Sequence, residues 1–282
     1  PNNRATENLM TEMQRALGLS VPDRSAKPRE RGISNLVDDG HGIAQLEDIL
    51  AMCHPYLDIV KLGWASAYLT PLLREKVELL RRHNIRTCLG GMMFEISFWQ
   101  NKIEEYAAFL EELDIDVVEI SNGSLPIPES DKRLMIEYFA KRGFTVLAEV
   151  GSKDVSVVSP PEEWIECIQA DLACGAWKVI TEGRADASAG IYTAEGEIRG
   201  QLIEEILESS LAHDDLVFEA PHKRQMAWFI KRVGANVNIG NVPLSEVMNL
   251  ETLRQGLRGD TVQDFHIHPN IVPLGGPDRE SA

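Results

Sequence analysis

Charged side chains follow a series of short apolar stretches along the chain, where the strands of a parallel sheet would end. The acidic ones are Asp38, Asp39, Glu95, Glu119, Glu149, Glu182 and Glu219, and the basic ones are Lys61, Lys153, Arg184, Lys223 and Arg224. A single carboxylate could cap a turn or form a salt bridge, but converging carboxylates raise one another's pKa unless a cation lies among them. Hard oxygen ligands without clustered His or Cys favour Mg²⁺ or Mn²⁺ over zinc. We therefore expect a metal site with Glu119, Glu149 and Glu182 as ligands.

The basic residues at the same positions indicate an anion-binding pocket. Lys61 lies inside the apolar stretch IVKLGW, where an unpaired lysine would be costly. It could reach the pocket directly or pair internally with a glutamate of a neighbouring strand. A metal with several fixed cations describes a pocket for a small polyanion such as a phosphorylated carboxylic acid. Gly240, in VNIGNVPLSE, precedes a predicted helix N-terminus, which is typical of a phosphate site.

The apolar stretches alternate with segments of helical periodicity through most of the chain. The predicted strands are residues 33–39, 58–64, 86–91, 116–123, 145–151, 177–183, 216–221 and 236–240. Eight strand-helix units over roughly 220 residues predict a (β/α)₈ TIM barrel, in which reactive residues lie at the carboxyl ends of the strands. The alternative is a doubly wound open sheet. It would normally carry a glycine-rich nucleotide loop, and VDDGHG has the wrong spacing for one.

Two helices have clear start signals. In TPLLREKVELLRRH, Thr70 is predicted as the N-cap and Pro71 as the first helical residue. In SPPEEWIECIQADLACG, Ser159 and Glu162 are predicted to form a capping box, and Gly175 to end the helix.

The ends of the chain have a different character from the repeating units. Residues 1–31 form a predicted N-terminal helical extension, in which an amphipathic helix in ENLMTEMQRALG is followed by the linker VPDRSAKPRER. We expect this extension to pack against the barrel or a neighbouring subunit. The barrel is predicted over 32–260, and 261–282 as a loop-like tail. His266 and His268 in that tail could bind a metal, but an ordinary loop pair is the preferred interpretation.

The composition narrows the possible partners. A formal net charge of −16 and a pI near 4.9 argue against nucleic acid or an anionic membrane as the main partner. No apolar run could span a bilayer and no signal-peptide pattern is visible, so we expect a cytoplasmic protein. The four cysteines are scattered, which favours free thiols. We also expect a homo-oligomer.

Seven motifs resemble one known family, in that family's order. They are VKLGW, GGMMFE, VEISNGS, AEVGSKD, ITEGR, VFEAPHKRQ and ETLRQGLRGDT. Together they resemble the phosphosulfolactate synthase family from about Arg31 to Thr261. The resemblance implies a barrel enzyme that adds sulfite to C3 of phosphoenolpyruvate with Mg²⁺, giving (2R)-3-sulfolactate 2-phosphate, the precursor used in coenzyme M or sulfolactate formation.

The resemblance also implies roles for individual residues. Lys153 would be the general acid that protonates C2, with a lowered pKa, while Lys61, Arg184 and Lys223 would hold the phosphate and sulfite anions. Independently of the resemblance, Ser121, His222, Asn238, Gly240 and Asn241 are further candidate substrate-binding residues.

The chain also departs from the family pattern. Many members read SDGS where this chain has Asn122, others have a second lysine where it has Ser152, and the loop ADASAG after Arg184 differs from theirs. The alternatives are therefore a related enzyme with another nucleophile or enol phosphate, or a non-catalytic relative, since plant heat-stress-associated proteins also resemble the family.

Overall fold

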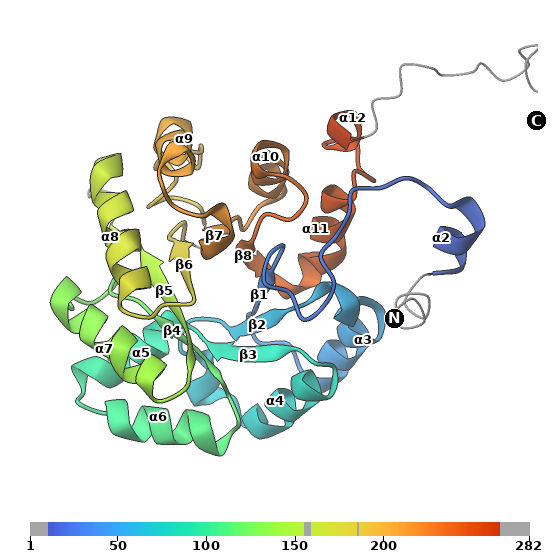
Figure 1. Ribbon diagram of the computed structural model, residues 1–282. Helices are drawn as coiled ribbons and strands as arrows, with labels where there is room; N and C mark the ends of the chain where they lie inside the picture. Colours follow the sequence, from blue (N-terminus) through green and yellow to red (C-terminus); the bar gives the residue numbers. More distant parts are fainter. Residues whose placement is uncertain (1–10, 155–158, 185, 266–282) are drawn as a thin grey trace, which may run out of the picture.

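Eight parallel strands close into a barrel in the order β1 to β8, and helices surround it (Figure 1). The computed structural model describes residues 11–154, 159–184 and 186–265. The strands are β1 (Ser34–Asp38), β2 (Ile59–Leu62), β3 (Arg86–Leu89), β4 (Val117–Ile120), β5 (Thr145–Val150), β6 (Lys178–Thr181), β7 (Leu216–Glu219) and β8 (Ile239–Pro243). The barrel closes where β1 pairs with β8. The TIM-barrel prediction is confirmed: each predicted strand overlaps an observed one, although β8 begins three residues later than predicted.

The helices follow the strands along the chain. They are α3 (Ile43–Cys53), α4 (Leu73–Arg82), α5 (Gly91–Trp99), α6 (Ile103–Glu112), α7 (Glu129–Lys141), α8 (Pro161–Ala173), α9 (Gly200–Glu208), α10 (Lys223–Val233), α11 (Val247–Arg254) and α12 (Val262–Phe265). Short 3₁₀ turns precede β2, α4, β7 and α11, at His54–Tyr56, Ser66–Leu69, His213–Asp215 and Leu244–Glu246.

Both predicted helix starts were wrong in detail. The N-cap of α4 is Leu72, because a 3₁₀ turn occupies the chain up to Leu69 and Thr70 donates its hydroxyl hydrogen bond back to Ser66 O. The N-cap of α8 is Pro160, and no side-chain hydrogen bond caps this helix. Its end was predicted correctly, since Gly175 follows the C-cap with a positive φ of 106°.

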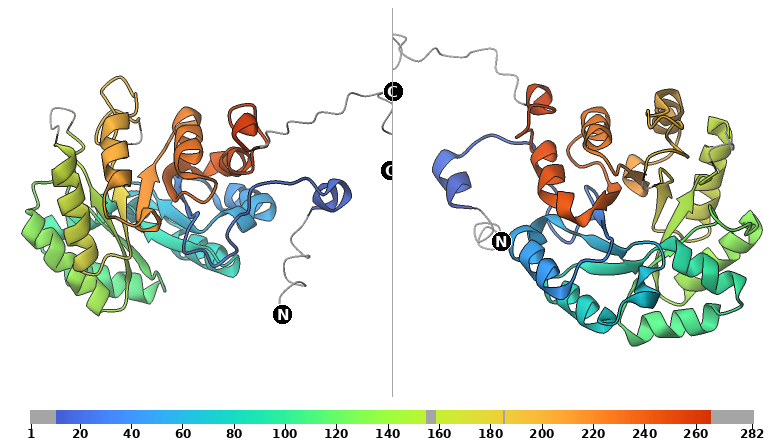
Figure 2. Two further views of the ribbon diagram at one scale, coloured as in Figure 1. Left: turned by 45° about the horizontal axis from the view of Figure 1, so that its top comes forward. Right: turned by 180° about the vertical axis from the view of Figure 1, so that it is seen from behind.

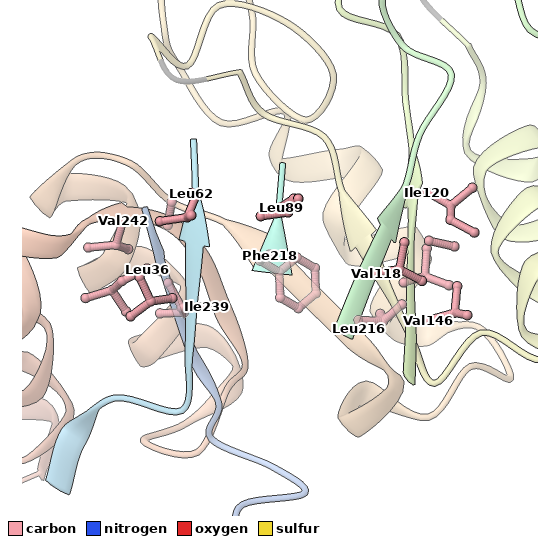
Figure 3. Close-up of a cluster of buried hydrophobic side chains, with 14 of the residues drawn as sticks. Leu36, Leu62, Leu89, Val118, Ile120, Val146, Leu216, Phe218, Ile239 and Val242 are labelled. Atoms are coloured by element: carbon pink, nitrogen blue, oxygen red, sulfur yellow. The ribbon is translucent and has the colours of Figure 1, made fainter. Parts of the chain in front are cut away.

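Strand side chains alternate between the two faces of the barrel wall. Those pointing outward pack under the helices in one large apolar cluster, part of which is drawn in Figure 3. Those pointing inward form a second layer of Ile33, Ile59, Cys88, Val117, Leu147, Ile180 and Val217. Two residues further along the same strands, the inward positions are Lys61, Glu119, Glu149, Glu182 and Glu219. An apolar plug in the barrel therefore supports a charged layer nearer its carboxyl end.

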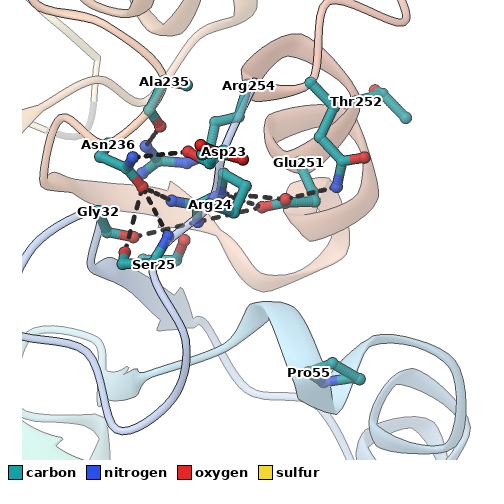
Figure 4. A network of polar contacts seen from close by, with 12 residues as sticks. Asp23, Arg24, Ser25, Gly32, Pro55, Ala235, Asn236, Glu251, Thr252 and Arg254 are labelled. Atoms are coloured by element: carbon teal, nitrogen blue, oxygen red, sulfur yellow. Dashed lines mark hydrogen bonds and ion pairs between the residues drawn. The ribbon is translucent and has the colours of Figure 1, made fainter. Parts of the chain in front are cut away.

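The segment before β1 packs across the amino end of the barrel. Arg24 lies 3.1 Å from Glu251 of α11 and donates hydrogen bonds to Asn236 Oδ1 and Gly32 O (Figure 4). Arg29 pairs with Asp58 at 2.9 Å. The linker thus packs against the barrel, as expected of the extension.

The amino-terminal helix α2 (Glu12–Leu17) does not pack in this way. It begins with a Thr11–Gln14 capping box and ends at Gly18, but none of its residues is buried. Figures 1 and 2 show it standing clear of the barrel in all three views.

At the other end of the chain, Thr261 is fully buried and α12 follows it, so the predicted loop-like tail begins with ordered structure. His266 and His268 lie outside the described residues.

Within the described part of the chain, no helix is long and apolar enough to cross a membrane. All four cysteines are free thiols.

Candidate active site

A cavity of about 280 Å³ opens at the carboxyl end of the barrel. Its lining includes Asp39, Lys61, Trp64, Glu119, Glu149, Lys153, Glu182, Arg184, Glu219, His222 and Asn241. The charged layer above the apolar plug therefore forms its floor and walls.

Lys61 occupies the floor of the cavity with its side chain only 7% exposed. Its Nζ lies 3.1 Å from Glu119 Oε2 and 3.5 Å from Glu219 Oε1. Burial alone would lower the pKa of Lys61, but Glu119, Glu219 and Glu149 raise it well above its usual value. Lys61 is therefore a fixed positive charge, paired across the barrel and lining the cavity at once.

Lys153 makes the second set of ion pairs, closer to the cavity mouth. Its Nζ donates a 2.7 Å hydrogen bond to Glu149 Oε1 and lies 3.1 Å from Glu182 Oε2. Burial favours the neutral amine, but the two carboxylates outweigh it and raise the pKa of Lys153. The expected lowering of this pKa was therefore wrong, because Lys153 lies among anions rather than among cations.

Three glutamates of the cavity have pKa values shifted in opposite directions. Burial opposes ionisation of Glu149, yet Lys153 and other donors hold its pKa at about 2. Burial, together with repulsion from Glu149 and Glu219, raises the pKa of Glu182 well above its usual value. For Glu219, burial outweighs the attraction of Lys61, and the pKa rises to about 7. Protons thus offset part of the excess negative charge in the cavity.

The donor set suits a hard cation, although the carboxylates do not form a closed coordination shell. Glu119 Oε2 and Glu182 Oε2 are buried and accept no hydrogen bond, with a lysine Nζ 3.1 Å from each. Among the described residues, Asp38, Asp39 and His41 form the only group of three or more His, Cys, Asp or Glu residues whose potential ligand atoms all lie within 4.8 Å of one another. The predicted ligands Glu119, Glu149 and Glu182 line one cavity, but lysines separate them. The donor chemistry, carboxylate oxygens at a charged cavity, therefore fits Mg²⁺, while each of these two oxygens is paired with a lysine.

The turn after β6 holds Arg184 at the cavity rim. The Gly183 N–H donates to Glu219 Oε2 at 2.9 Å and the Arg184 N–H to Glu182 Oε1 at 2.5 Å, so this turn orients two glutamates. Arg184 has a positive φ of 55° and a side chain that is 40% exposed. Its Nε lies 3.6 Å from Oδ1 of the exposed Asp186, and Arg184 also lines the cavity.

The small residues after Arg184 have a packing role. Ala187 and Ala189 are buried, and a Cβ at Gly190 would collide with the Glu182 backbone carbonyl. Small side chains at these three positions let the loop fold back against the Glu182 turn.

Several predicted substrate-binding residues do not line the cavity. Asn238 lies at the opposite end of the barrel, where its side chain bonds Ile33 N, Asp214 O and Leu216 O. It precedes β8, because that strand begins at Ile239, later than predicted. Lys223 points outside and pairs with Asp260 at 3.1 Å.

Of the other four predicted substrate-binding residues, two line the cavity and two do not. Ser121 is buried and donates to Glu95, and Gly240 lies within β8 beside Glu219. His222 and Asn241 do line the cavity.

Sequence reasoning missed three parts of the site. Glu219 stood among the charged strand ends but was not assigned a role, although it repeats the Val117–Glu119 pattern of an apolar residue and a charged one two positions later. Trp64 lines the cavity and has a positive φ of 54°, a conformation that no sequence pattern predicts. Asp39 lines it from the loop after β1.

Comparisons with known proteins agree with this architecture. The family model for (2R)-phospho-3-sulfolactate synthase matches residues 22–260. Phosphosulfolactate synthase of Bacillus subtilis is 41% identical over 245 residues, covering 86% of this chain and 97% of that protein. The Methanothermobacter thermautotrophicus protein of the same name is 37% identical over 252 residues, covering 88% and 97%. The Arabidopsis thaliana protein HEAT-STRESS-ASSOCIATED 32 is 23% identical over 257 residues, covering 82% and 88%.

Solved structures resemble the chain in fold alone. The 3-hexulose-6-phosphate synthase of Salmonella typhimurium has a TM-score of 0.52 at 11% identity, covering 78% of this chain and 97% of that one. Named homologues over most of the chain, with a cavity of buried ion pairs at the catalytic end of a TIM barrel, indicate an enzyme. The chain belongs to the phosphosulfolactate synthase family.

Proposed function

We propose that the protein adds sulfite to C3 of phosphoenolpyruvate and forms (2R)-3-sulfolactate 2-phosphate. The observation that carries the proposal is the position of Lys153, whose ammonium group is held between Glu149 and Glu182 in the cavity wall. Relatives named phosphosulfolactate synthase support the choice of reaction. A non-catalytic role is less consistent with a cluster of buried charges, since such a cluster contributes little to stability.

The cavity would hold a Mg²⁺ ion through Glu119, Glu149 and Glu182. When bound, the ion supplies positive charge to the substrate carboxylate as that group becomes more negative. Deprotonation of Glu182 would accompany binding, because metal ligands must be ionised.

The reaction requires one new C–S bond and one proton. The sulfur lone pair of sulfite attacks C3, and the C2–C3 π electrons move to C2 and into the carboxylate, giving an enediolate. Lys153 then donates its proton to C2, the phosphate ester stays intact, and the lysine regains a proton from solvent. A raised pKa keeps Lys153 charged, and transfer remains favourable because the carbanion is a much stronger base than an amine.

The other cations would bind the anionic substrates. The partly exposed Arg184 is suited to the phosphate or sulfite, because a guanidinium binds such oxyanions with two parallel hydrogen bonds. Lys61, held between Glu119 and Glu219, would provide a fixed charge beneath the substrate. His222 and Asn241 would add polar contacts at the rim.

The direct test is an assay with phosphoenolpyruvate, sulfite and Mg²⁺, following the loss of enol-phosphate absorbance. We expect loss only when all three are present, and none after chelation. Thermal stabilisation by phosphoenolpyruvate without sulfite-dependent loss would favour a related enzyme with another nucleophile. The absence of both effects would favour a non-catalytic relative.

A further inference from the structure

Glu95 is a buried carboxylate next to the active site that does not line the cavity. It lies in α5 and is completely buried. Within the described residues, no ion pair joins it to a lysine or arginine. An unpaired buried carboxylate requires several hydrogen bonds to offset its lost hydration. The donors that hydrogen-bond to the Glu95 carboxylate therefore indicate what Glu95 does.

Among the described residues, the Glu95 carboxylate accepts three hydrogen bonds, all from the loop between β4 and α7. Ser121 Oγ donates to Glu95 Oε1 at 2.5 Å, and the N–H groups of Ser124 and Leu125 donate to Oε2 at 3.1 and 2.7 Å. One carboxylate therefore fixes both ends of a five-residue turn.

The centre of that turn lies against Lys153. Gly123 O accepts a hydrogen bond from Lys153 N at 3.4 Å. A Cβ added to Gly123 would lie 3.2 Å from Lys153 Cγ and 3.4 Å from Lys153 Cδ. The loop thus packs against the aliphatic part of Lys153, and a Cβ at Gly123 would press on that side chain.

The same helix also orients a glutamate of the cavity. The Gly91 N–H, in the first turn of α5, donates to Glu119 Oε1 at 2.7 Å. Helix α5 therefore contacts the site through Glu119 on one side and through the Glu95-bound loop on the other.

We propose that Glu95 is a positioning residue, which holds the loop 121–125 against Lys153 and so keeps the ammonium group directed into the cavity. This inference rests on the proposed role of Lys153 as proton donor. A displacement of about 1 Å in a reacting group can cost roughly 100-fold in rate. Loss of Glu95 should therefore reduce proton transfer more than substrate binding.

The test compares Glu95→Ala with Glu95→Gln and Gly123→Ala in the full chain. We expect Glu95→Ala to lower kcat about 10- to 100-fold, with a much smaller change in KM for phosphoenolpyruvate. Glu95→Gln should recover most of kcat, since its oxygen can accept the backbone N–H bonds while its amide donates to Ser121. Gly123→Ala should lower kcat with Glu95 intact, and it covers the case in which Glu95→Ala does not fold.

The matched control is Glu251→Ala, which removes another buried glutamate at the opposite end of the barrel. It should lower thermal stability and leave kcat unchanged. Equal kcat losses in the folded Glu95→Ala and Glu251→Ala variants would overturn the proposal, as would an unchanged kcat in both Glu95→Ala and Gly123→Ala.

Two measurements do not depend on sulfite addition. Hydrogen exchange at the Ser124 and Leu125 amides should accelerate in Glu95→Ala, because those N–H groups lose their acceptor. Labelling of the Lys153 amine by an acylating reagent, followed by mass spectrometry, should also accelerate. If the wild type does not add sulfite, the proposed function fails, and these two measurements still decide whether Glu95 positions Lys153. Wild-type exchange and labelling in folded Glu95→Ala would overturn that role.

Discussion

At the scale of single residues, the site depends on two lysines that separate four glutamates. Lys61 pairs with Glu119 and Glu219, and Lys153 pairs with Glu149 and Glu182. Each lysine has a raised pKa because the carboxylates outweigh the cost of burial. Both are therefore permanent cations in the working pH range, and the side chain of Lys153 is the more exposed, at 27% against 7% for Lys61.

Lys153→Ala should separate catalysis from binding. We expect turnover to fall by about 10²- to 10⁴-fold, the usual contribution of a general acid. The affinity for phosphoenolpyruvate, measured by calorimetry, should change little because Arg184 and Lys61 remain. Lys141→Ala, on the exposed surface of α7, is the matched control and should behave as wild type. Turnover within tenfold of wild type would remove Lys153 from the acid role.

Because the pKa of Glu219 is raised in the folded protein, we expect the free energy of unfolding to depend on pH. This pKa rises from 4.5 to about 7 on folding, so between these values the folded protein keeps a proton that the unfolded chain has lost. The free energy of unfolding should therefore decrease as pH rises from about 5 to 8, and Glu182, whose pKa is also raised, adds to the decrease. Urea unfolding in EDTA would measure it.

Glu219→Gln should reduce this decrease by at most about 3 kcal/mol, since one pKa unit corresponds to about 1.4 kcal/mol. The glutamine can still accept the hydrogen bond from the Gly183 N–H, so the substitution removes the titrating group and keeps this contact. An equally steep decrease in both proteins would show that Glu219 does not titrate in this range.

At the scale of elements, the strands follow from sequence more directly than the site does. Alternation along each strand predicts that Glu119 and Glu149 point inward, because each comes two residues after an apolar residue of the plug. The pairing of each lysine with two glutamates depends on the barrel closing, so no local pattern could predict it. Asn238 was also misplaced by local patterns. The strand β8 begins at Ile239, a few residues later than predicted, so Asn238 precedes the strand instead of lying at its carboxyl end.

Helices α7 and α8 are joined behind the site by a buried ion pair. Lys132 is 1% exposed, and its Nζ lies 2.7 Å from both Asp171 Oδ2 and Glu149 O. Removing one partner leaves a buried charge uncompensated. Lys132→Met should therefore lower the free energy of unfolding by about 3 to 5 kcal/mol.

The double variant Lys132→Met/Asp171→Leu should lose less stability than Lys132→Met alone, because both buried charges are gone. Lys141→Met breaks an exposed pair with Glu137 on the same helix and should cost less than about 1 kcal/mol. Chemical unfolding of the three variants measures the difference, and a double variant less stable than the single one would contradict this interpretation.

At the scale of the whole molecule, the amino-terminal segment has two parts with different roles. Residues around Arg24 pack across the base of the barrel, whereas α2 buries none of its residues and leaves Met13 and Leu17 exposed. The expected packing of the extension was right for the first part. The predicted homo-oligomer stays a prediction.

The variant Arg24→Ala tests whether the contact of this segment with the base of the barrel stabilises the fold. Loss of the Arg24 ion pair leaves Glu251 buried without a cation, so the free energy of unfolding should fall by about 3 kcal/mol. Met13→Ala, on α2, should change it by less than about 0.5 kcal/mol in a monomer. The variants can be compared by urea unfolding, and equal stability would show that the base contact contributes little.

The central claim is that this barrel adds sulfite to C3 of phosphoenolpyruvate and delivers a proton to C2. Proton NMR of the full reaction in deuterium oxide tests both steps at once. We expect the vinyl signals to disappear only with sulfite and Mg²⁺ present, and one product to form with a CH₂ group at C3 and deuterium at C2. Persistence of the vinyl signals, in a sample that still binds phosphoenolpyruvate, would contradict it.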